Sequence, residues 1–178
     1  NVGIGVQALQ DNTTGTQNVA VGANALDANT TGQSNCAFGM NSLGSNTTAT
    51  KNTGFGHRTL AENTTGADNV AVGADSLDAN TTGTYNTGVG RATLTNLTTG
   101  SNNVAIGRVA MELAQTSYNS VAVGVRSLDA NLSGGYNTAV GDGALSAYTG
   151  SENTAVGGNA LAVCTTGHDN TGLGVNAL

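Results

Sequence analysis

The chain has 178 residues and a formal net charge of −6, with 27 Gly, no Pro or Trp, 3% aromatic and 9% charged residues. Soluble domains carry about 25% charged residues, so both the charged surface and the large core side chains of an ordinary globular domain are scarce here. Five basic residues argue against a nucleic-acid partner, and the lack of any run of about 18 apolar residues argues against membrane insertion. Because 38% of the residues are hydrophobic, the composition does not predict disorder.

One sequence motif is repeated from end to end. A glycine preceded four residues earlier by Asn recurs every 17 residues, with one interval of 16 between Gly141 and Gly157. These glycines are Gly5, Gly22, Gly39, Gly56, Gly73, Gly90, Gly107, Gly124, Gly141, Gly157 and Gly174. We number repeat positions 1 to 17 from the Asn that begins each copy (Ser120 in one copy), so these glycines occupy position 5. Ten copies and half of an eleventh predict a single repeat array over residues 1–178, with no second domain.

The first positions of the repeat read as a strand. Position 1 is Asn in all but one copy, which predicts an amide ladder along the array. Position 3 is always Ala or Gly, which suggests that another chain packs closely there. Position 2 (Val, Thr or Cys36) and position 4 lie on the same side of the strand. Position 4 is always apolar, and we predict that it forms the structural core column. This column is Ile4, Val21, Phe38, Phe55, Val72, Val89, Ile106, Val123, Val140, Val156 and Leu173.

The second half of the repeat contains one more apolar position and a turn. Position 9 is Leu in every copy except Met111, and we expect it to face the core. The Asn-Thr-Thr-Gly block at positions 12 to 15 is turn chemistry, predicted to lie outside. It also creates glycosylation sequons, so these turns are candidate surface or glycan positions. The sequon asparagines are Asn12, Asn29, Asn46, Asn63, Asn80, Asn96 and Asn131.

Seventeen residues with two turn signals leave room for two strands of about four to six residues in each copy. Glycine at short fixed intervals disfavours helices. The sequence therefore predicts an all-β fold, a parallel β-solenoid (β-roll) of about ten 17-residue coils. With strands about 4.8 Å apart, the array would be a rod of about 50 Å.

The segment 119–124, NSVAVG, resembles the head repeat of trimeric autotransporter adhesins, N-S-V-A-I-G. Copies such as NTAVGDGAL with N-T-T-G turns are similar to repeats in phage and large-virus tail-fibre proteins. The resemblance covers the whole chain, although the adhesin repeat is shorter. It implies a left-handed β-roll that assembles as a homotrimer or filament, in a segment of a longer extracellular, cell-surface or virion fibre.

Residues with catalytic or metal-binding chemistry do not recur at useful spacings. His57 and His168 lie more than six copies apart, which predicts two separate surface histidines. Cys36 and Cys164 are also too far apart for a disulfide, which needs Cα atoms within about 7 Å. Cys36 reads as a small core residue. The paired glycines of G-x-G lack the third glycine of a dinucleotide loop. We therefore expect no enzyme activity, no catalytic or metal residues and no cofactor.

A second period of 51 residues relates Asp27, Asp78 and Asp129. Duplication of a three-copy unit explains it most simply, and a contact made by every third coil is the alternative.

These observations favour a structural and adhesive fibre segment whose partners are further copies of itself and a host-surface or glycan receptor. The alternative is an ice- or glycan-binding surface built on the stacked Thr and Asn turns, in which Thr-Thr places one Thr per coil outward. The tyrosines fall at three repeat positions, so they supply no site repeated in every copy.

Overall fold

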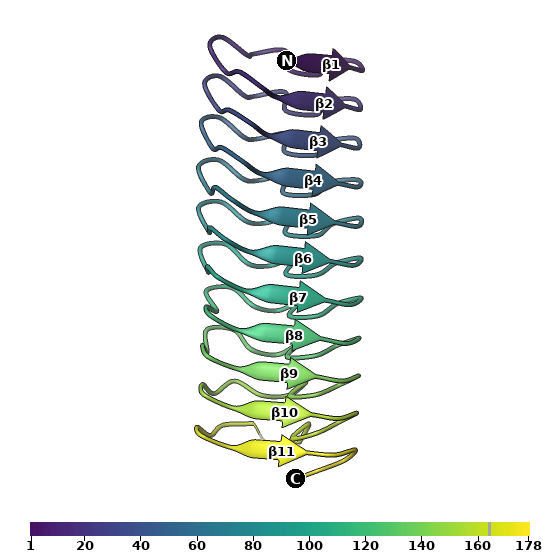
Figure 1. The fold of residues 1–178 in the computed structure, drawn as a ribbon, viewed down its shortest axis with the longest axis vertical. Coiled ribbons are helices and arrows are strands. Elements are labelled where there is room, and N and C mark those ends of the chain that lie inside the picture. The colour runs from purple at the N-terminus through teal and green to yellow at the C-terminus, as the bar shows by residue number, and fades with distance from the viewer. Residues whose placement is uncertain (164) are drawn as a thin grey trace.

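A computed structural model describes residues 1–163 and 165–178. The predicted fold is confirmed: the chain is all β, and each copy forms one coil of a parallel solenoid (Figure 1). Eleven strands form one sheet in the order β1 to β11, and the two termini lie at opposite ends of the rod. The strands are β1 Val2–Ile4, β2 Val19–Val21, β3 Cys36–Phe38, β4 Thr53–Phe55, β5 Val70–Val72, β6 Thr87–Val89, β7 Val104–Ile106, β8 Val121–Val123, β9 Thr138–Val140, β10 Thr154–Val156 and β11 Thr171–Leu173.

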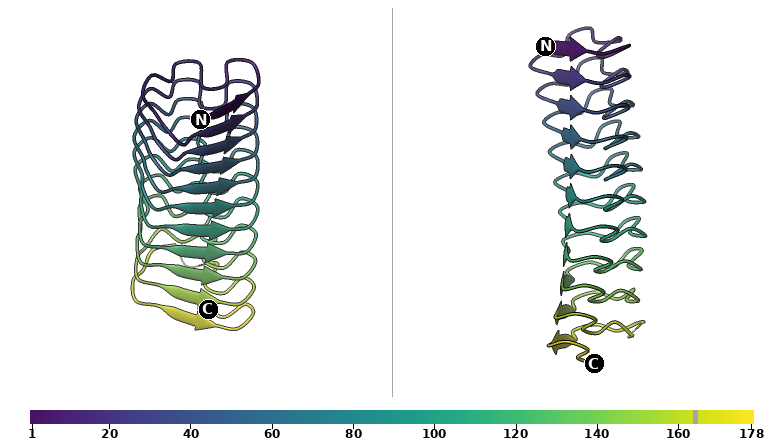
Figure 2. Two further views of the ribbon diagram at one scale, coloured as in Figure 1. Left: turned by 45° about the horizontal axis from the view of Figure 1, so that its top comes forward. Right: turned by 90° about the vertical axis from the view of Figure 1, so that its right-hand side faces the viewer.

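Each coil has two walls (Figure 2). One wall is the sheet, whose register pairs equal repeat positions, for example Ala71 with Gly88. The other wall was predicted to be a second strand, and that prediction is wrong, because the chain there runs through consecutive turns. Positions 7 and 9 have positive φ in this wall, as at Asp75 (59°) and Leu77 (53°), so the backbone cannot stay extended.

The turn wall is nevertheless hydrogen-bonded from coil to coil. The amide of Leu26 donates to the carbonyl of Ser42 in the next coil at 3.1 Å, and that of Asn24 donates to Val6 in the previous coil at 2.9 Å. Similar bonds recur along the rod at positions 5, 7, 9 and 13. They satisfy backbone groups that the strands leave unpaired.

Position 5 needs glycine for two reasons. At Gly90, φ is 134°, a backbone conformation that residues with a Cβ rarely adopt. A Cβ placed there would lie 2.7 Å from the carbonyl oxygen of Gly107 in the next coil. The invariant glycine therefore sets how closely consecutive coils stack at this corner.

The core lies between the two walls and contains small side chains. Between the first and last coils the leucines of position 9 are buried, as predicted, and they face the Ala or Gly of position 3. Position 3 was interpreted as a surface for another chain, and that is wrong, because Ala71 and Ala105 are fully buried inside their own coil. Where position 3 is Gly88, position 8 is Thr93, and a Cβ on Gly88 would lie 2.6 Å from the hydroxyl of Ser76.

The predicted core column at position 4 is wrong, because it faces outward. The middle residue of each three-residue strand points inward, so its neighbours at positions 2 and 4 point to the other face. The interior has room only for Ala or Gly opposite Leu, and the larger side chains are excluded from it. None of the eleven residues is buried: Ile4, Val21, Phe38, Phe55, Val72, Val89, Ile106, Val123, Val140, Val156 and Leu173. Cys36, at position 2, likewise lies on the outer face rather than in the core.

Two columns of asparagine are buried. In the predicted position 1 ladder, the amide of Asn35 donates to the side-chain oxygen of Asn18 at 2.9 Å, and the side chain of Asn18 donates to the carbonyl of Gly32 at 2.8 Å. The same pattern recurs along the rod, so the ladder is confirmed, with side chain to backbone bonds as its main element.

The second column, at position 12, corrects the interpretation of the sequons. Asn46 donates to Asn29 at 2.8 Å, and Asn80 donates to Asn63 at 2.8 Å. Five of the sequon asparagines are fully buried and cannot carry surface glycans in the folded chain: Asn29, Asn46, Asn63, Asn80 and Asn131. Asn12 in the first coil is half-buried, and Asn96, at position 11, is exposed.

The copy with 16 residues keeps its register. Tyr148 replaces the position 12 asparagine and is fully buried. Its hydroxyl donates to the side-chain oxygen of Asn153 at 3.1 Å and accepts from the amide of Asn170 at 2.6 Å. The large side chain therefore fills the missing residue's space and joins the next two coils.

The part of the chain that the structure describes has no helix with the length and hydropathy that a membrane crossing requires.

Candidate interaction surfaces

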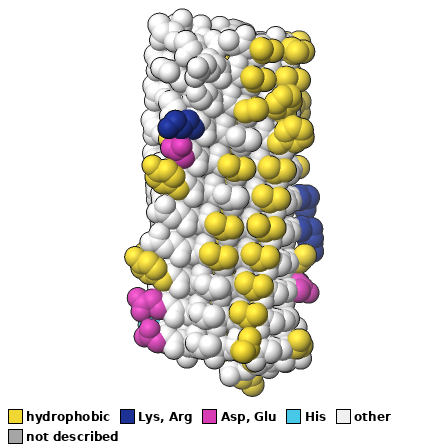
Figure 3. Space-filling view, viewed as in Figure 1, with side chains coloured by type: hydrophobic (Ala, Val, Ile, Leu, Met, Phe, Trp, Pro, Cys, Tyr) yellow, Lys and Arg dark blue, Asp and Glu magenta, His cyan; other side chains and the backbone are white. Residues whose placement is uncertain are grey.

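The outer face of the sheet carries two columns of side chains along the whole rod (Figure 3). Position 2 supplies Val, Thr and Cys, and position 4 supplies Val, Ile, Phe and Leu. Phe55 is 57% exposed and Ile106 is 41% exposed, although both are large apolar residues in a regular strand. We call positions 2 and 4 of β1 to β11 the apolar sheet face. Contiguous apolar patches beyond a few hundred Å² are unusual on monomers and mark interaction sites.

Side chains on the apolar sheet face contact one another between neighbouring coils. The rings of Phe38 and Phe55 stack with centroids 5.3 Å apart and planes at 29°. The Cys36 thiol lies in the neighbouring column, and burial raises its pKa, so it is protonated at neutral pH and poorly nucleophilic. Cys164 lies outside the described residues.

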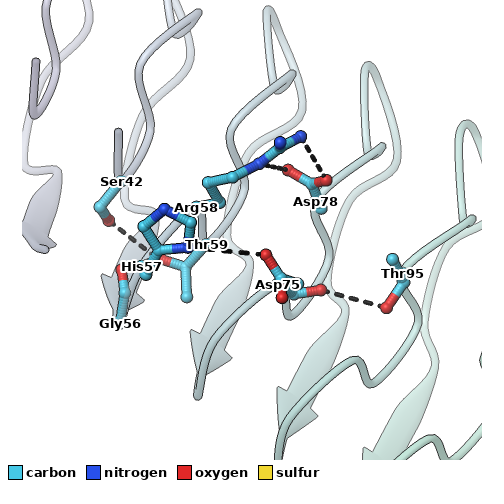
Figure 4. A network of polar contacts seen from close by, with 8 residues as sticks. All are labelled: Ser42, Gly56, His57, Arg58, Thr59, Asp75, Asp78 and Thr95. Carbon is cyan, nitrogen blue, oxygen red and sulfur yellow. Dashed lines mark hydrogen bonds and ion pairs between the residues drawn. The ribbon is translucent and has the colours of Figure 1, made fainter. Parts of the chain in front are cut away.

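Charged side chains gather at the turn wall (Figure 4). The guanidinium of Arg58 donates to the two carboxylate oxygens of Asp78 in the next coil, at 3.4 Å and 2.8 Å, and this bonding raises the pKa of Arg58. His57 lies 3.7 Å from Asp75, and Thr95 donates to the carbonyl of Asp75 at 3.1 Å. These contacts join neighbouring coils at an exposed surface, where single ion pairs contribute little to stability.

The three aspartates of the 51-residue period do not share a partner. Asp78 has Arg58, whereas one side-chain oxygen of Asp27 and one of Asp129 are buried without a partner among the described residues. Burial, followed by the charge of Glu112, raises the pKa of Asp129. Within the described part of the chain the side chains of these three aspartates therefore make no contact in common, which supports duplication.

Beside Asp27 the turn wall is hollowed into an open polar groove of about 410 Å³. It is lined by Gln7, Asn24, Asp27, Asn41, Gly44, Ser45, Arg58, Ala61 and Glu62. Asn24 donates to Asn41 at 3.0 Å across two coils. Arg58, which lines the groove, occupies the same repeat position as Gln7 and bonds to Asp78 of the next coil.

The histidines and the Thr pairs are the remaining candidates that the sequence suggested. His57 and His168 are both exposed, as expected, and lie in different coils. Across residues 1–163 and 165–178, no three His, Cys, Asp or Glu side chains come together as metal ligands. In the Thr pairs, Thr30 donates to the carbonyl of Thr47 in the next coil, while the side chain of Thr31 is exposed, so a coil that carries the pair presents one outward Thr as expected. A single file of hydroxyls is a weaker match to a crystalline ligand than two parallel files.

Sequence reasoning missed two features of these surfaces, and both had a signal. Position 3 is always Ala or Gly, whereas positions 2 and 4 carry larger side chains. This pattern indicates that the interior is too narrow for the side chains of positions 2 and 4, which must therefore point outward. The replacement of the position 12 asparagine by Leu97, Ala114 and Tyr148 in other copies indicates a buried column, because apolar residues substitute there freely.

No known family model, no curated protein and no solved structure matches this chain.

Proposed function

We propose that the chain is a structural and adhesive rod segment of an extracellular, cell-surface or virion fibre. In this proposal several copies assemble side by side through the apolar sheet face, as a homotrimer of left-handed coils. The observation that carries it is the exposure of large apolar side chains at equal positions in every coil. The resemblance to adhesin and tail-fibre repeats supports the same assembly.

The geometry of the face supports association over its whole length. Equal repeat positions are in register, so one rod presents an apolar side chain of position 4 at every coil spacing of about 4.8 Å. Two or three such faces brought together would remove Val, Ile and Phe side chains from water, at roughly 25 cal/mol per Å² of apolar area. A small contribution from each coil, repeated along the rod, would give a stable interface.

The rod itself suits a fibre. Each strand contacts only the adjacent strands, and backbone hydrogen bonds and the Asn ladders join neighbouring coils, so the structure extends along one axis without a central domain. An array of such coils spaces whatever it carries at its two ends.

The test is the oligomeric state of variants that place charge on the apolar sheet face. We expect the unmodified chain to sediment as a trimer at micromolar concentration and the Phe55→Asp, Ile106→Asp double variant to sediment as a monomer. Both side chains point outward, so the circular dichroism of the variant should be unchanged. As a matched control, Thr65→Asp with Leu113→Asp adds the same charge at exposed sites outside this face and should leave the trimer intact. A monomeric unmodified chain, or a double variant that still assembles, would refute the proposal.

A further inference from the structure

Three of the four tyrosines of the chain lie on one edge of the rod within four consecutive coils. Tyr85 and Tyr136 occupy position 17, and Tyr118 occupies the adjacent position 16. They are 61%, 57% and 40% exposed, respectively. Between Tyr85 and Tyr136, position 17 is occupied by Asn102 and Asn119, whose side chains are exposed. We call these five residues the tyrosine edge.

The backbone holds the tyrosine edge in a fixed arrangement. All four residues at position 17 have positive φ, between 50° and 61°, so their side chains leave the coil at the same corner. Each of their amides donates to a position 16 carbonyl of the previous coil, as Asn102 does to Thr84 at 3.0 Å and Tyr136 does to Tyr118 at 3.2 Å. Three coil spacings of about 4.8 Å separate Tyr85 from Tyr136, which makes a strip of about 14 Å.

One end of the strip is built around a glycine. The ring of Tyr118 lies against Gly135, where an added Cβ would be 2.5 Å from two ring carbons. Tyr118 and Gly135 also form an isolated parallel bridge outside the main sheet. In this position Tyr118 meets Tyr136 edge to face, with ring centroids 5.4 Å apart and planes at 86°. The aromatic pair is therefore in place before any ligand arrives, which lowers the entropy cost of binding.

The chemistry of the strip is aromatic, hydrogen-bonding and uncharged. Segments 82–85, 99–102, 116–119 and 133–136, which form this edge, contain no Asp, Glu, Lys or Arg. Acidic residues flank it at position 17, Asp68 before Tyr85 and Glu152 after Tyr136. The side-chain amides of Asn102 and Asn119 make no hydrogen bond within the described part of the chain, so they are available as donors and acceptors. Tyrosine with Asn, Ser and Gly is also the composition of surfaces that bind by rigid rings and adaptable hydrogen bonds.

We infer that the tyrosine edge is a discrete binding site for a short neutral oligosaccharide. Pyranose rings present apolar C–H faces that stack on tyrosine, and their neighbouring hydroxyl groups match the donor and acceptor pair of a primary amide. The flanking carboxylates disfavour anionic sugars. The inference adds a ligand class to the attachment role proposed above and rests on it, but it concerns a different surface from the apolar sheet face.

The test uses the whole chain and four neutral trisaccharides as probes: maltotriose, cellotriose, mannotriose and triacetylchitotriose. Saturation-transfer difference NMR should show transfer to at least one of them. The variants Tyr85→Ser with Tyr136→Ser, and Tyr118→Ser, should weaken binding about tenfold or more, since truncating a tyrosine at the centre of a contact typically costs over 1 kcal/mol. Serine already occupies position 17 at Ser34 and position 16 at Ser101, so the fold accepts it. Leu113→Ala, an exposed apolar residue at another edge, is the matched control and should bind normally.

Sedimentation of the same samples separates this inference from the proposed function. Loss of binding in the tyrosine variants with an unchanged oligomer supports the inference. It is overturned if none of the four trisaccharides binds at millimolar concentration, if the tyrosine variants bind as well as the unmodified chain, or if the Leu113→Ala control loses binding equally. A chain that binds the trisaccharides as a monomer would support the site and refute the trimer.

Discussion

The buried asparagine column at position 12 allows a sharp comparison between two substitutions of the same type. Asn63 is in the middle of the ladder: it donates to Asn46 at 3.1 Å and to the carbonyl of Gly66 at 2.9 Å, and it accepts from Asn80. Asn80 is at the end of the ladder, because the next coil has Leu97 at this position, and its side-chain oxygen has no partner among the described residues.

Leucine at the two positions should have different costs. Asn63→Leu leaves the buried oxygen of Asn46 without a donor and takes one acceptor from the Asn80 amide, which should cost about 2 to 4 kcal/mol. Asn80→Leu leaves the number of unpaired buried oxygens unchanged. The side-chain oxygen of Asn63 loses its donor, but the unpaired side-chain oxygen of Asn80 is itself removed. The carbonyl of Gly83 keeps its bond from Asn69 at 2.8 Å, and the new Leu would pack on Leu97. We expect a cost of about 0 to 1 kcal/mol.

Equilibrium unfolding in urea, followed by circular dichroism, would measure both changes in the free energy of unfolding. Hydrogen exchange would show whether the loss of protection is concentrated in the coils next to the substitution, as expected for a chain in which each strand contacts only adjacent strands. Equal destabilisation by the two variants, or a larger effect of Asn80→Leu, would refute the ladder as the source of the stability.

Three further outcomes are expected. Gly90→Ala should destabilise the chain by several kcal/mol, measured by urea unfolding, because of its φ of 134° and the 2.7 Å approach to the next coil; a silent substitution would contradict the packing described. Ala71→Leu should lower the free energy of unfolding by about 1 to 3 kcal/mol through overpacking, because this residue lies inside the coil. The oligomeric state should not change. A variant that is fully stable but dissociates would instead support packing of another chain against position 3. Because the folded pKa of Asp129 is raised above the ordinary 3.8, its contribution to stability is present below pH 3.8 and is lost as pH rises through the folded pKa. The stability of Asp129→Asn relative to the unmodified chain should therefore increase as pH rises from 3 to 7. Asp78→Asn, which removes the hydrogen bond to Arg58, should instead be less stable than the unmodified chain at pH 7. Thermal melts across this range would measure both differences, and a difference for Asp129→Asn that does not change with pH would contradict the raised pKa.

The period of the sequence was sufficient to predict the architecture. A 17-residue repeat with an invariant Gly and a Leu in every copy but one predicts stacked parallel coils, and the position 9 core and the position 1 ladder followed from it. The direction of the strand side chains could not be read from hydrophobicity alone. Alternation tells which residues share a face, but Val72 and Ala71 are both apolar, and only the width of the interior decides which of them is inside.

The turn wall could not be predicted for a different reason. Leucine at positive φ is uncommon, so no local preference suggests that Leu77 sits in this conformation. It is stabilised there by burial and by the hydrogen bond from its amide to Thr93 of the next coil, contacts that exist only after the coils have stacked. Similarly, Asn-Thr-Thr-Gly is turn chemistry in any protein, and the burial of its Asn depends on the coil above and below.

Tyr148 shows how such an array tolerates changes in its length. Removing a whole 17-residue coil would leave every remaining interface of the same kind, so the number of coils is free to vary. Removing a single residue would shift all subsequent positions if nothing compensated, yet β9 and β10 remain paired in register, Thr138 with Thr154. The buried phenol occupies the gap and bonds to the asparagines of the two coils that follow. A deletion error is thus confined to the coil in which it occurs, provided that a larger side chain arises at the same place.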